Sequence, residues 1–193
     1  TTAYWLNITR DRGSENRAKQ SPVAIAISVR PTKASSTTSQ YAVVATHDGG
    51  PTLMFRAANK RRNRILEARL WVTLVRDEIT AEGEFFRRFY DLTMVRAHTP
   101  LFALSWTAMH AITPESPLYG ETAASLAAVN GEIIIILTGI DETLSQTIHA
   151  RHSFLAEEIL WDHRFVDILG QTPDGRRSID YGKFHRVKPL EKI

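Results

Sequence analysis

One run of the sequence, ILEARLWVTLVRDEI at residues 65–79, alternates apolar and polar side chains with high regularity. A strand points successive side chains to opposite faces, so this alternation predicts a strand with one buried face. The apolar positions of the predicted strand are Leu66, Ala68, Leu70, Val72 and Leu74. The run is the strongest strand signal in the chain, and it favours a fold built from sheets.

Turn signals divide much of the remaining chain into segments of strand length. The sequences HDGGP at 47–51 and PDG at 173–175 contain the residues that tight reversals need. About eight to ten short strands are expected, and one helix is predicted at 122–129, capped by Thr122 or Glu121. The fold class predicted is all-β, an immunoglobulin-like β-sandwich with one short helix. Other predicted strands cover 41–46, 52–57, 100–110, 131–139 as a fully buried strand, 159–166 and 179–184.

The composition is that of one ordinary domain. The chain has 193 residues, of which 43% are hydrophobic and 23% are charged, which allows one domain with a real core. No run reaches the roughly 18 apolar residues of a membrane-spanning helix, and we recognise no signal peptide pattern. The absence of cysteine excludes disulfides, a thiolate nucleophile and cysteine-ligated zinc.

Charge is unevenly distributed along the chain. Residues 97–150 contain no Lys or Arg, whereas basic residues cluster at 56–69 and again at 176–192. Such asymmetry indicates surfaces that meet different partners, or solvated faces that are balanced by their neighbours in space. The turn NKRRNR at 59–64 has four cations and no aromatic residue, which favours anionic lipid over nucleic acid. A merely solvated loop remains an equal alternative.

The sequence does not predict an enzyme or a metalloprotein. The chain lacks an HExxH zinc motif, a nucleotide-binding glycine loop and a nucleophile elbow around its serines. His149, His152 and His163 lie near several carboxylates, but residues three apart on a strand face opposite ways. We therefore expect no catalytic residues, no metal and no cofactor.

The predicted strand at 159–166 mixes apolar and charged residues on both of its faces. A strand that only closed a core would keep its charges on one side. We therefore expect this strand to meet a second surface, such as another subunit.

Five runs of the sequence, in order, carry a family resemblance. They are PTLMFRAANKRRNRILEARL, EGEFFRRFYDL, SWTAMHAITPESPLYGET, GEIIIILTGIDETLSQTIHARHSFLAEEILWDHRFVD and DGRRSIDYGKFH, and together they cover most of residues 41–185. In this order they resemble the cytoplasmic domain of inward-rectifier potassium channels, especially of the bacterial branch.

The resemblance implies a homotetrameric potassium channel, which we expect to be voltage-gated. The tetramer would form a fourfold ring at the cytoplasmic face of the membrane and extend the path of potassium ions. By this resemblance, Gly139, Ile140, Asp141 and Glu142 would belong to the loop that narrows the pore at its membrane end. Glu67 would be the acidic, pore-facing position that attracts cations in related channels.

The resemblance also implies contacts with lipid and with neighbouring subunits. Arg61 and Arg62 match basic positions associated with phosphoinositide response, and Arg30 resembles the basic residue after the inner pore helix. These three residues are the expected site for anionic phospholipid headgroups. Polar contacts that hold the pore loop or a neighbouring subunit are expected from Arg151, Glu157 and Arg164.

The chain departs from the family at several places. The potassium filter TVGYG and both membrane helices are absent, and residues 93–100 lack the acidic pair of strongly rectifying relatives. We divide the chain into an N-terminal segment and linker at 1–40, the family-like domain at 41–185 and a tail at 186–193. The alternative function is a free-standing immunoglobulin-like module that binds a protein or an anionic lipid.

Overall fold

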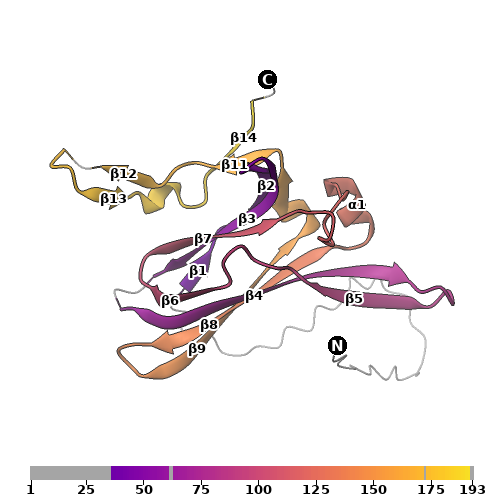
Figure 1. The fold of residues 1–193 in the computed structure, drawn as a ribbon, viewed down its shortest axis with the longest axis horizontal. Helices are drawn as coiled ribbons and strands as arrows, with labels where there is room; N and C mark the ends of the chain where they lie inside the picture. The colour runs from indigo at the N-terminus through magenta and orange to yellow at the C-terminus, as the bar shows by residue number, and fades with distance from the viewer. Residues whose placement is uncertain (1–35, 61–62, 172, 192–193) are drawn as a thin grey trace, which may run out of the picture. The chain divides into compact units, whose positions relative to one another are not determined.

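Two five-stranded sheets pack face to face and build most of the described part of the chain (Figure 1). The computed structural model describes residues 36–60, 63–171 and 173–191, all within the unit Lys33–Ile193. The strands of the first sheet are β1 (Ser36–Thr38), β2 (Ala42–His47), β3 (Gly50–Asn59), β7 (Ser105–Ala111) and β10 (Ile159–Trp161). Those of the second are β4 (Ile65–Ile79), β5 (Phe85–Asp91), β6 (His98–Phe102), β8 (Glu132–Asp141) and β9 (Gln146–Leu155).

Each sheet has a defined strand order, and a tight turn joins β2 to β3. In the first sheet the order is β1-β3-β2-β10, with β7 also paired to β3, and β10 runs parallel to β2. In the second the order is β5-β4-β8-β9, with β6 also paired to β4. The β2–β3 hairpin turns at Asp48 and Gly49, whose φ angles of 50° and 83° suit a two-residue hairpin turn in which both central residues have positive φ. The predicted turn at 47–51 is therefore confirmed.

Smaller elements complete the described fold. The helix α1 (Ala123–Ala128) begins after Thr122, whose side chain accepts a hydrogen bond from the backbone N–H of Ser125. Thr122 is thus the cap, one of the two residues predicted for that role. Two short ribbons and two 3-10 helices follow: β11 (His163–Phe165) with β14 (Val187–Pro189), β12 (Leu169–Gln171) with β13 (Arg177–Ile179), η1 (Ala156–Glu158) and η2 (Tyr181–Lys183).

The core lies between the two sheets. Leu53 and Phe55 from β3 meet Val72 from β4 and Phe154 from β9, and the rings of Phe55 and Phe154 are 6.0 Å apart. All four side chains are at most 1% exposed. The structure thus confirms an all-β sandwich, with one short α-helix among the described residues, whereas the immunoglobulin-like character stays a prediction.

The segment 159–166 is not one strand, and this prediction was wrong. Asp162 has a φ angle of 56°, a left-handed conformation that ends β10 and redirects the chain before β11. The strand β10 pairs with β2, whereas β11 pairs with β14. The mixed faces in the sequence therefore come from two strands with different neighbours.

Three further predictions about strands need correction. Residues 100–110 contain the end of β6 and most of β7, which belong to different sheets and are separated by Ala103 and Leu104. The strand at 131–139 extends to Asp141, and it is not fully buried, because Ile136 is 40% exposed. After the PDG turn, the returning strand β13 ends at Ile179 and a 3-10 helix follows.

Candidate functional site

The expected pore-facing residue Glu67 lies at an irregularity in the pairing of β4 with β8. The register shifts between Leu66 and Arg69, so that two residues of β4 oppose Gly139 alone. Glu67 has a φ angle of 48° and an exposed side chain. A bulge of this kind redirects a side chain away from the regular alternation of its strand. It therefore exposes the Glu67 carboxylate at the surface of the second sheet.

Gly139 makes this bulge possible. A Cβ atom at position 139 would lie 2.4 Å from Cγ2 of Ile65 and 3.1 Å from the carbonyl oxygen of Leu66. Ile65 is 0% exposed, so its side chain has little room to move. Glycine is therefore required by close packing against β4, which also fixes the backbone beside Glu67.

The turn between β3 and β4 is bonded to the end of β8. Nδ2 of Asn63 donates to Oδ2 of Asp141 at 2.6 Å, and the backbone N–H of Glu142 donates to the carbonyl oxygen of Arg64 at 3.0 Å. Nη1 of Arg64 also lies 3.7 Å from Oε1 of Glu142, in an exposed ion pair that adds little energy. These contacts hold Asn63 and Arg64, just before β4, against residues predicted to narrow a pore.

The structure places the carboxylate of Asp141, one of the residues expected to attract cations, inside the protein, and its role in a pore stays a prediction. Gly139, Ile140 and Asp141 belong to the strand β8 rather than to a loop, and the Asp141 side chain is fully buried. Its Oδ1 accepts hydrogen bonds from the backbone N–H groups of Thr143 and Leu144. Asp141 therefore organises the β8–β9 turn, whereas the next acidic residue, Glu142, is exposed.

The three expected lipid-binding residues, Arg30, Arg61 and Arg62, lie outside the described residues. On the flanks of the β3–β4 turn, Lys60 is exposed and the side chain of Arg64 is 61% exposed. Two exposed cations therefore border this turn.

The three expected interface residues lie on separate elements. Arg151 is on β9, Glu157 is in η1 and Arg164 is on β11, and all three are exposed. No hydrogen bond or ion pair of their side chains occurs within the described part of the chain. The structure does not bring them together, and their predicted contacts with a pore loop or a neighbouring subunit stay a prediction.

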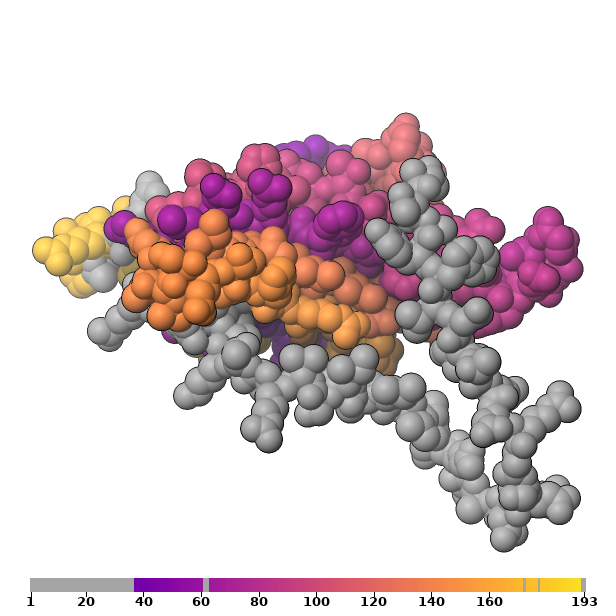
Figure 2. Space-filling model, turned by 90° about the horizontal axis from the view of Figure 1, so that it is seen from below, coloured from indigo at the N-terminus to yellow at the C-terminus, as the bar shows by residue number. Residues whose placement is uncertain are grey.

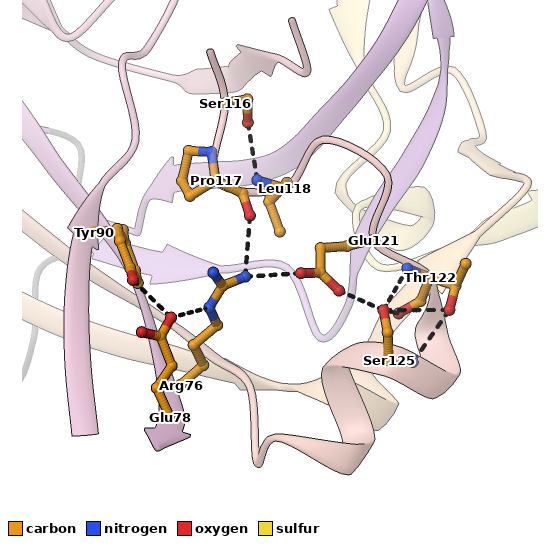
Figure 3. Close-up of polar contacts among 9 residues, drawn as sticks. All are labelled: Arg76, Glu78, Tyr90, Ser116, Pro117, Leu118, Glu121, Thr122 and Ser125. Carbon is orange, nitrogen blue, oxygen red and sulfur yellow. Dashed lines mark hydrogen bonds and ion pairs between the residues drawn. The ribbon is translucent and has the colours of Figure 1, made fainter. Parts of the chain in front are cut away.

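A polar network around Arg76 was missed by the sequence reasoning (Figure 3). The Arg76 guanidinium lies 2.8 Å from Oε1 of Glu78 and 2.7 Å from Oε1 of Glu121, and it stacks over the ring of Tyr90. Glu121 also accepts a hydrogen bond from the hydroxyl of Ser125, in the first turn of α1. The network connects the β4–β5 hairpin to the start of the helix.

Contacts within the Arg76 network favour the charged forms of Arg76 and Glu78. Burial lowers the pKa of Arg76, but the hydrogen bond and negative charge of Glu78, together with the nearby Tyr90 hydroxyl, outweigh burial and raise this pKa above its ordinary value. The hydrogen bond from the Tyr90 hydroxyl, followed by that from Arg76, holds the pKa of Glu78 below its ordinary value. The sequence offered only weak signals for this network, because its two carboxylates, those of Glu78 and Glu121, lie 43 residues apart in the chain.

A buried histidine forms a second polar centre. Nδ1 of His110 lies 2.8 Å from the carbonyl oxygen of Thr93, and Nε2 lies 2.7 Å from Oγ of Ser116. The Thr93 carbonyl accepts from Nδ1–H, which leaves Nε2 to accept from the Ser116 hydroxyl. Burial lowers the pKa of His110, which favours this neutral form. The pair fixes the chain after β7 and offers no exposed nucleophile.

Neither a metal site nor a membrane-spanning helix is found within residues 36–60, 63–171 and 173–191. No three His, Asp or Glu side chains there gather as metal ligands. No helix of this part has the length and apolar character needed to cross a bilayer.

The comparison with protein families and the comparison with individual proteins point to the same family. The family described as inward rectifier potassium channel C-terminal domain matches residues 37–193. The inward rectifier potassium channel Kirbac3.1 of Paramagnetospirillum magnetotacticum is 48% identical over 145 residues, which are 75% of this chain and 49% of that protein. The ATP-sensitive inward rectifier potassium channel 12 of Gallus gallus is 37% identical over 164 residues, 82% of this chain and 38% of that protein.

The chain thus spans about half the length, or less, of these relatives. Their names describe inward rectifiers and give no support to the expectation of a voltage-gated channel.

Proposed function

The chain belongs to the inward rectifier potassium channel C-terminal domain family, and on this premise we propose that it is the regulatory and assembly domain of such a channel. It is a channel component and not an enzyme. In the proposed assembly, four copies form a homotetrameric ring on the cytoplasmic face of the membrane and extend the path of potassium ions. The absent pore and filter are supplied by other parts of the channel.

The observation that carries this proposal is the coupling of the β3–β4 turn to the end of β8. The bonds from Asn63 to Asp141 and from Glu142 to Arg64 join the two segments that the family resemblance assigns to lipid and to the pore. A displacement of the basic turn would shift the end of β8 through these bonds. Such a connection is one physical route by which a regulatory ligand can act on an ion pathway.

Within the assembly, we assign Glu67 and Glu142 to the wall of the ion pathway, with Gly139 and Ile140 contributing their backbone. A single exposed carboxylate attracts a potassium ion by about 1 kcal/mol at 4 Å in water. Fourfold repetition around an axis adds such small terms, as in rings of acidic side chains in cation channels. The buried Asp141 contributes through the turn that it organises.

Arg30, Arg61 and Arg62 are the proposed contacts for anionic phospholipid headgroups. Lys60 and Arg64 would add to the same basic surface, because each cation near an anionic membrane contributes about 1 kcal/mol. Arg151, Glu157 and Arg164 are the proposed polar contacts between subunits, and their exposure leaves them available for that role.

Sedimentation velocity of the whole chain over a range of concentrations tests the assembly. We expect a species of four times the chain mass of 21.8 kDa as the concentration rises. A monomer at millimolar concentration would instead favour a free-standing module that binds a protein or a lipid.

Flotation with phosphatidylinositol phosphate vesicles tests the lipid contacts. The double variant Arg61→Ala/Arg62→Ala should lose most of its binding, since two cations near an anionic membrane contribute about 2 kcal/mol. The matched control is Arg186→Ala/Lys188→Ala, which removes two exposed side chains of equal charge elsewhere. Equal loss in both variants would show attraction by net charge alone and would contradict the assignment.

A further inference from the structure

The wall that the proposed function gives to the ion pathway contains a basic residue beside Glu67. Arg69 lies two positions after Glu67 on β4, and its side chain is exposed. It is paired with Thr138 on β8, and residues that are opposite each other across a strand pair lie on the same face of the sheet. Figure 2 shows that the β8–β9 region, in orange, forms much of the surface on its side of the molecule. The acidic position of the wall therefore has a cation as its neighbour.

The space in front of Arg69 is open and is lined without a carboxylate. An open hollow of about 660 Å³ is lined by Arg69, Leu70, Trp71, Ala97, His98, Ile136 and Thr138, none of which is acidic. His98 lies opposite Arg69 on β6, and the backbone N–H of Leu70 donates to the carbonyl oxygen of Ala97 at 2.7 Å. This bond holds the start of β6 against β4, so the surroundings of Arg69 are well defined.

The charge of Arg69 is not neutralised by an ion pair within the described part of the chain. Along β4 the nearest acidic residue is Glu67, at the bulge. Asp91 on β5 lies opposite Thr73, about 13 Å along β4 from Arg69. Its Oδ1 already accepts hydrogen bonds from Trp71 and Thr73. Each chain thus adds one negative and one positive charge to the wall near Glu67, and their sum is zero.

This balance of charges matters most for cations of high charge. The Coulomb energy between a cation and a fixed charge is proportional to the charge of the cation. A wall with Glu67 alone would therefore concentrate divalent and trivalent cations much more strongly than potassium ions. Such cations would occupy the path and slow potassium flux, because conduction requires ions to leave as readily as they enter. A positive charge beside Glu67 removes most of this excess attraction.

We propose that Arg69 is a specificity-determining residue of the ion pathway, which keeps multivalent cations from accumulating beside Glu67. The inference rests on the proposed function, because it requires Glu67 to face the ion path. In the proposed homotetramer, four copies of Arg69 would act on the same path, so a modest effect of each charge becomes measurable.

Inhibition of potassium flux by multivalent cations tests the proposal. Residues 37–193 would replace the matching region of Kirbac3.1, and potassium flux into liposomes would be measured with Mg²⁺ or with hexaamminecobalt(III) on the side that carries the domain. The cobalt complex has three fixed charges and does not titrate. We expect Arg69→Gln to lower the inhibiting concentration about fourfold for Mg²⁺ and about eightfold for the trivalent ion, a factor of about two for each charge of the cation.

Two substitutions serve as controls. Arg69→Lys keeps the positive charge and should change inhibition by either cation less than about twofold. Arg186→Gln removes an exposed charge just before β14, away from the wall, and should also alter inhibition less than about twofold. Added salt should reduce the effect of Arg69→Gln, because salt screens exposed charges.

Glu67→Gln separates a failure of this inference from a failure of the proposed function. If Glu67 faces the ion path, Glu67→Gln should weaken inhibition by both cations and lower potassium flux. The role of Arg69 alone would be wrong if Glu67→Gln acts in this way but Arg69→Gln leaves inhibition unchanged, or changes it equally for the divalent and the trivalent ion. Loss of the tetramer in Arg69→Gln but not in Arg186→Gln would assign Arg69 to assembly and would also overturn the proposal. A channel that conducts and is inhibited equally with and without both substitutions would overturn the placement of Glu67 and this inference with it.

Discussion

Replacing Gly139 with alanine should destabilise the domain through a single misplaced methyl group. The new Cβ would lie 2.4 Å from Cγ2 of Ile65, where ordinary contacts between carbon atoms are about 3.5–4.0 Å. The Ile65 side chain is fully buried, and the Leu66 carbonyl and the Ala68 backbone close the other sides. The methyl group can be accepted only if β4 and β8 move apart at the bulge.

The expected cost follows from two opposing effects. Overpacking in a filled core costs about 1–3 kcal/mol, whereas alanine has an entropic advantage over glycine of roughly 0.5–1 kcal/mol in a strand. We expect a net loss of about 1–2 kcal/mol, which lowers the melting temperature by about 2–8 °C in a domain of this size. Urea unfolding followed by tryptophan fluorescence measures the change in unfolding free energy.

A matched control separates the clash from the general effect of losing a glycine. A Cβ atom added to Gly50, at the start of β3, would meet no atom within 4 Å beyond its chain neighbours, so Gly50→Ala should change stability by less than about 0.5 kcal/mol. Removing the opposing methyl group through Ile65→Ala should make the added Gly139→Ala change nearly neutral. Unchanged stability of Gly139→Ala alone would refute the packing argument.

Three further predictions concern buried polar groups. Arg56→Met removes hydrogen bonds to the carbonyl oxygens of residues 166 (2.7 Å) and 184 (3.3 Å). Because these oxygens are left unpaired, the unfolding free energy measured in urea should fall by about 2–4 kcal/mol, and proteolysis of the C-terminal segment should become faster. Cleavage at the normal rate would contradict this prediction. Arg76→Met should lower the unfolding free energy by about 1–3 kcal/mol, because the partly buried carboxylates of Glu78 and Glu121 lose their cation. An unchanged melting temperature would contradict this prediction. Burial holds the pKa of His110 below its ordinary 6.5. The contribution of His110 to the unfolding free energy should therefore be fully present above pH 6.5 and fall as the pH drops toward the lowered pKa. The variant His110→Gln should flatten this decline, whereas His149→Gln, at an exposed position, should not.

The parts of the fold that depend on local rules were predictable from the sequence. The run at 65–79 has the bounds of β4, and its alternation holds from Ala68 to Leu74, because the period of a strand is independent of its partners; the bulge at Glu67 breaks it, so that Ile65 rather than Leu66 is fully buried. The HDGGP turn and the Thr122 cap were also predicted, since each is formed by neighbouring residues. Local chemistry of this kind needs no knowledge of distant contacts.

Features that depend on pairing between distant strands were not predictable. Asp162 gives no sign in the sequence of its left-handed backbone, so the break between β10 and β11 was missed. The strand β9 was not among the predicted strands, although Ile148, Ala150 and Phe154 alternate toward the core. The burial of Asp141 depends on Asn63, which is 78 residues earlier in the chain.

Potassium flux through a chimeric channel tests the central claim most directly. Residues 37–193 would replace the matching region of Kirbac3.1 from Paramagnetospirillum magnetotacticum, and flux would be measured in liposomes. We predict a tetrameric channel whose potassium flux falls severalfold with Glu67→Lys and stays unchanged with Glu82→Lys, which makes the same charge change in the exposed β4–β5 turn. A folded tetramer that conducts equally with both substitutions would contradict the claim.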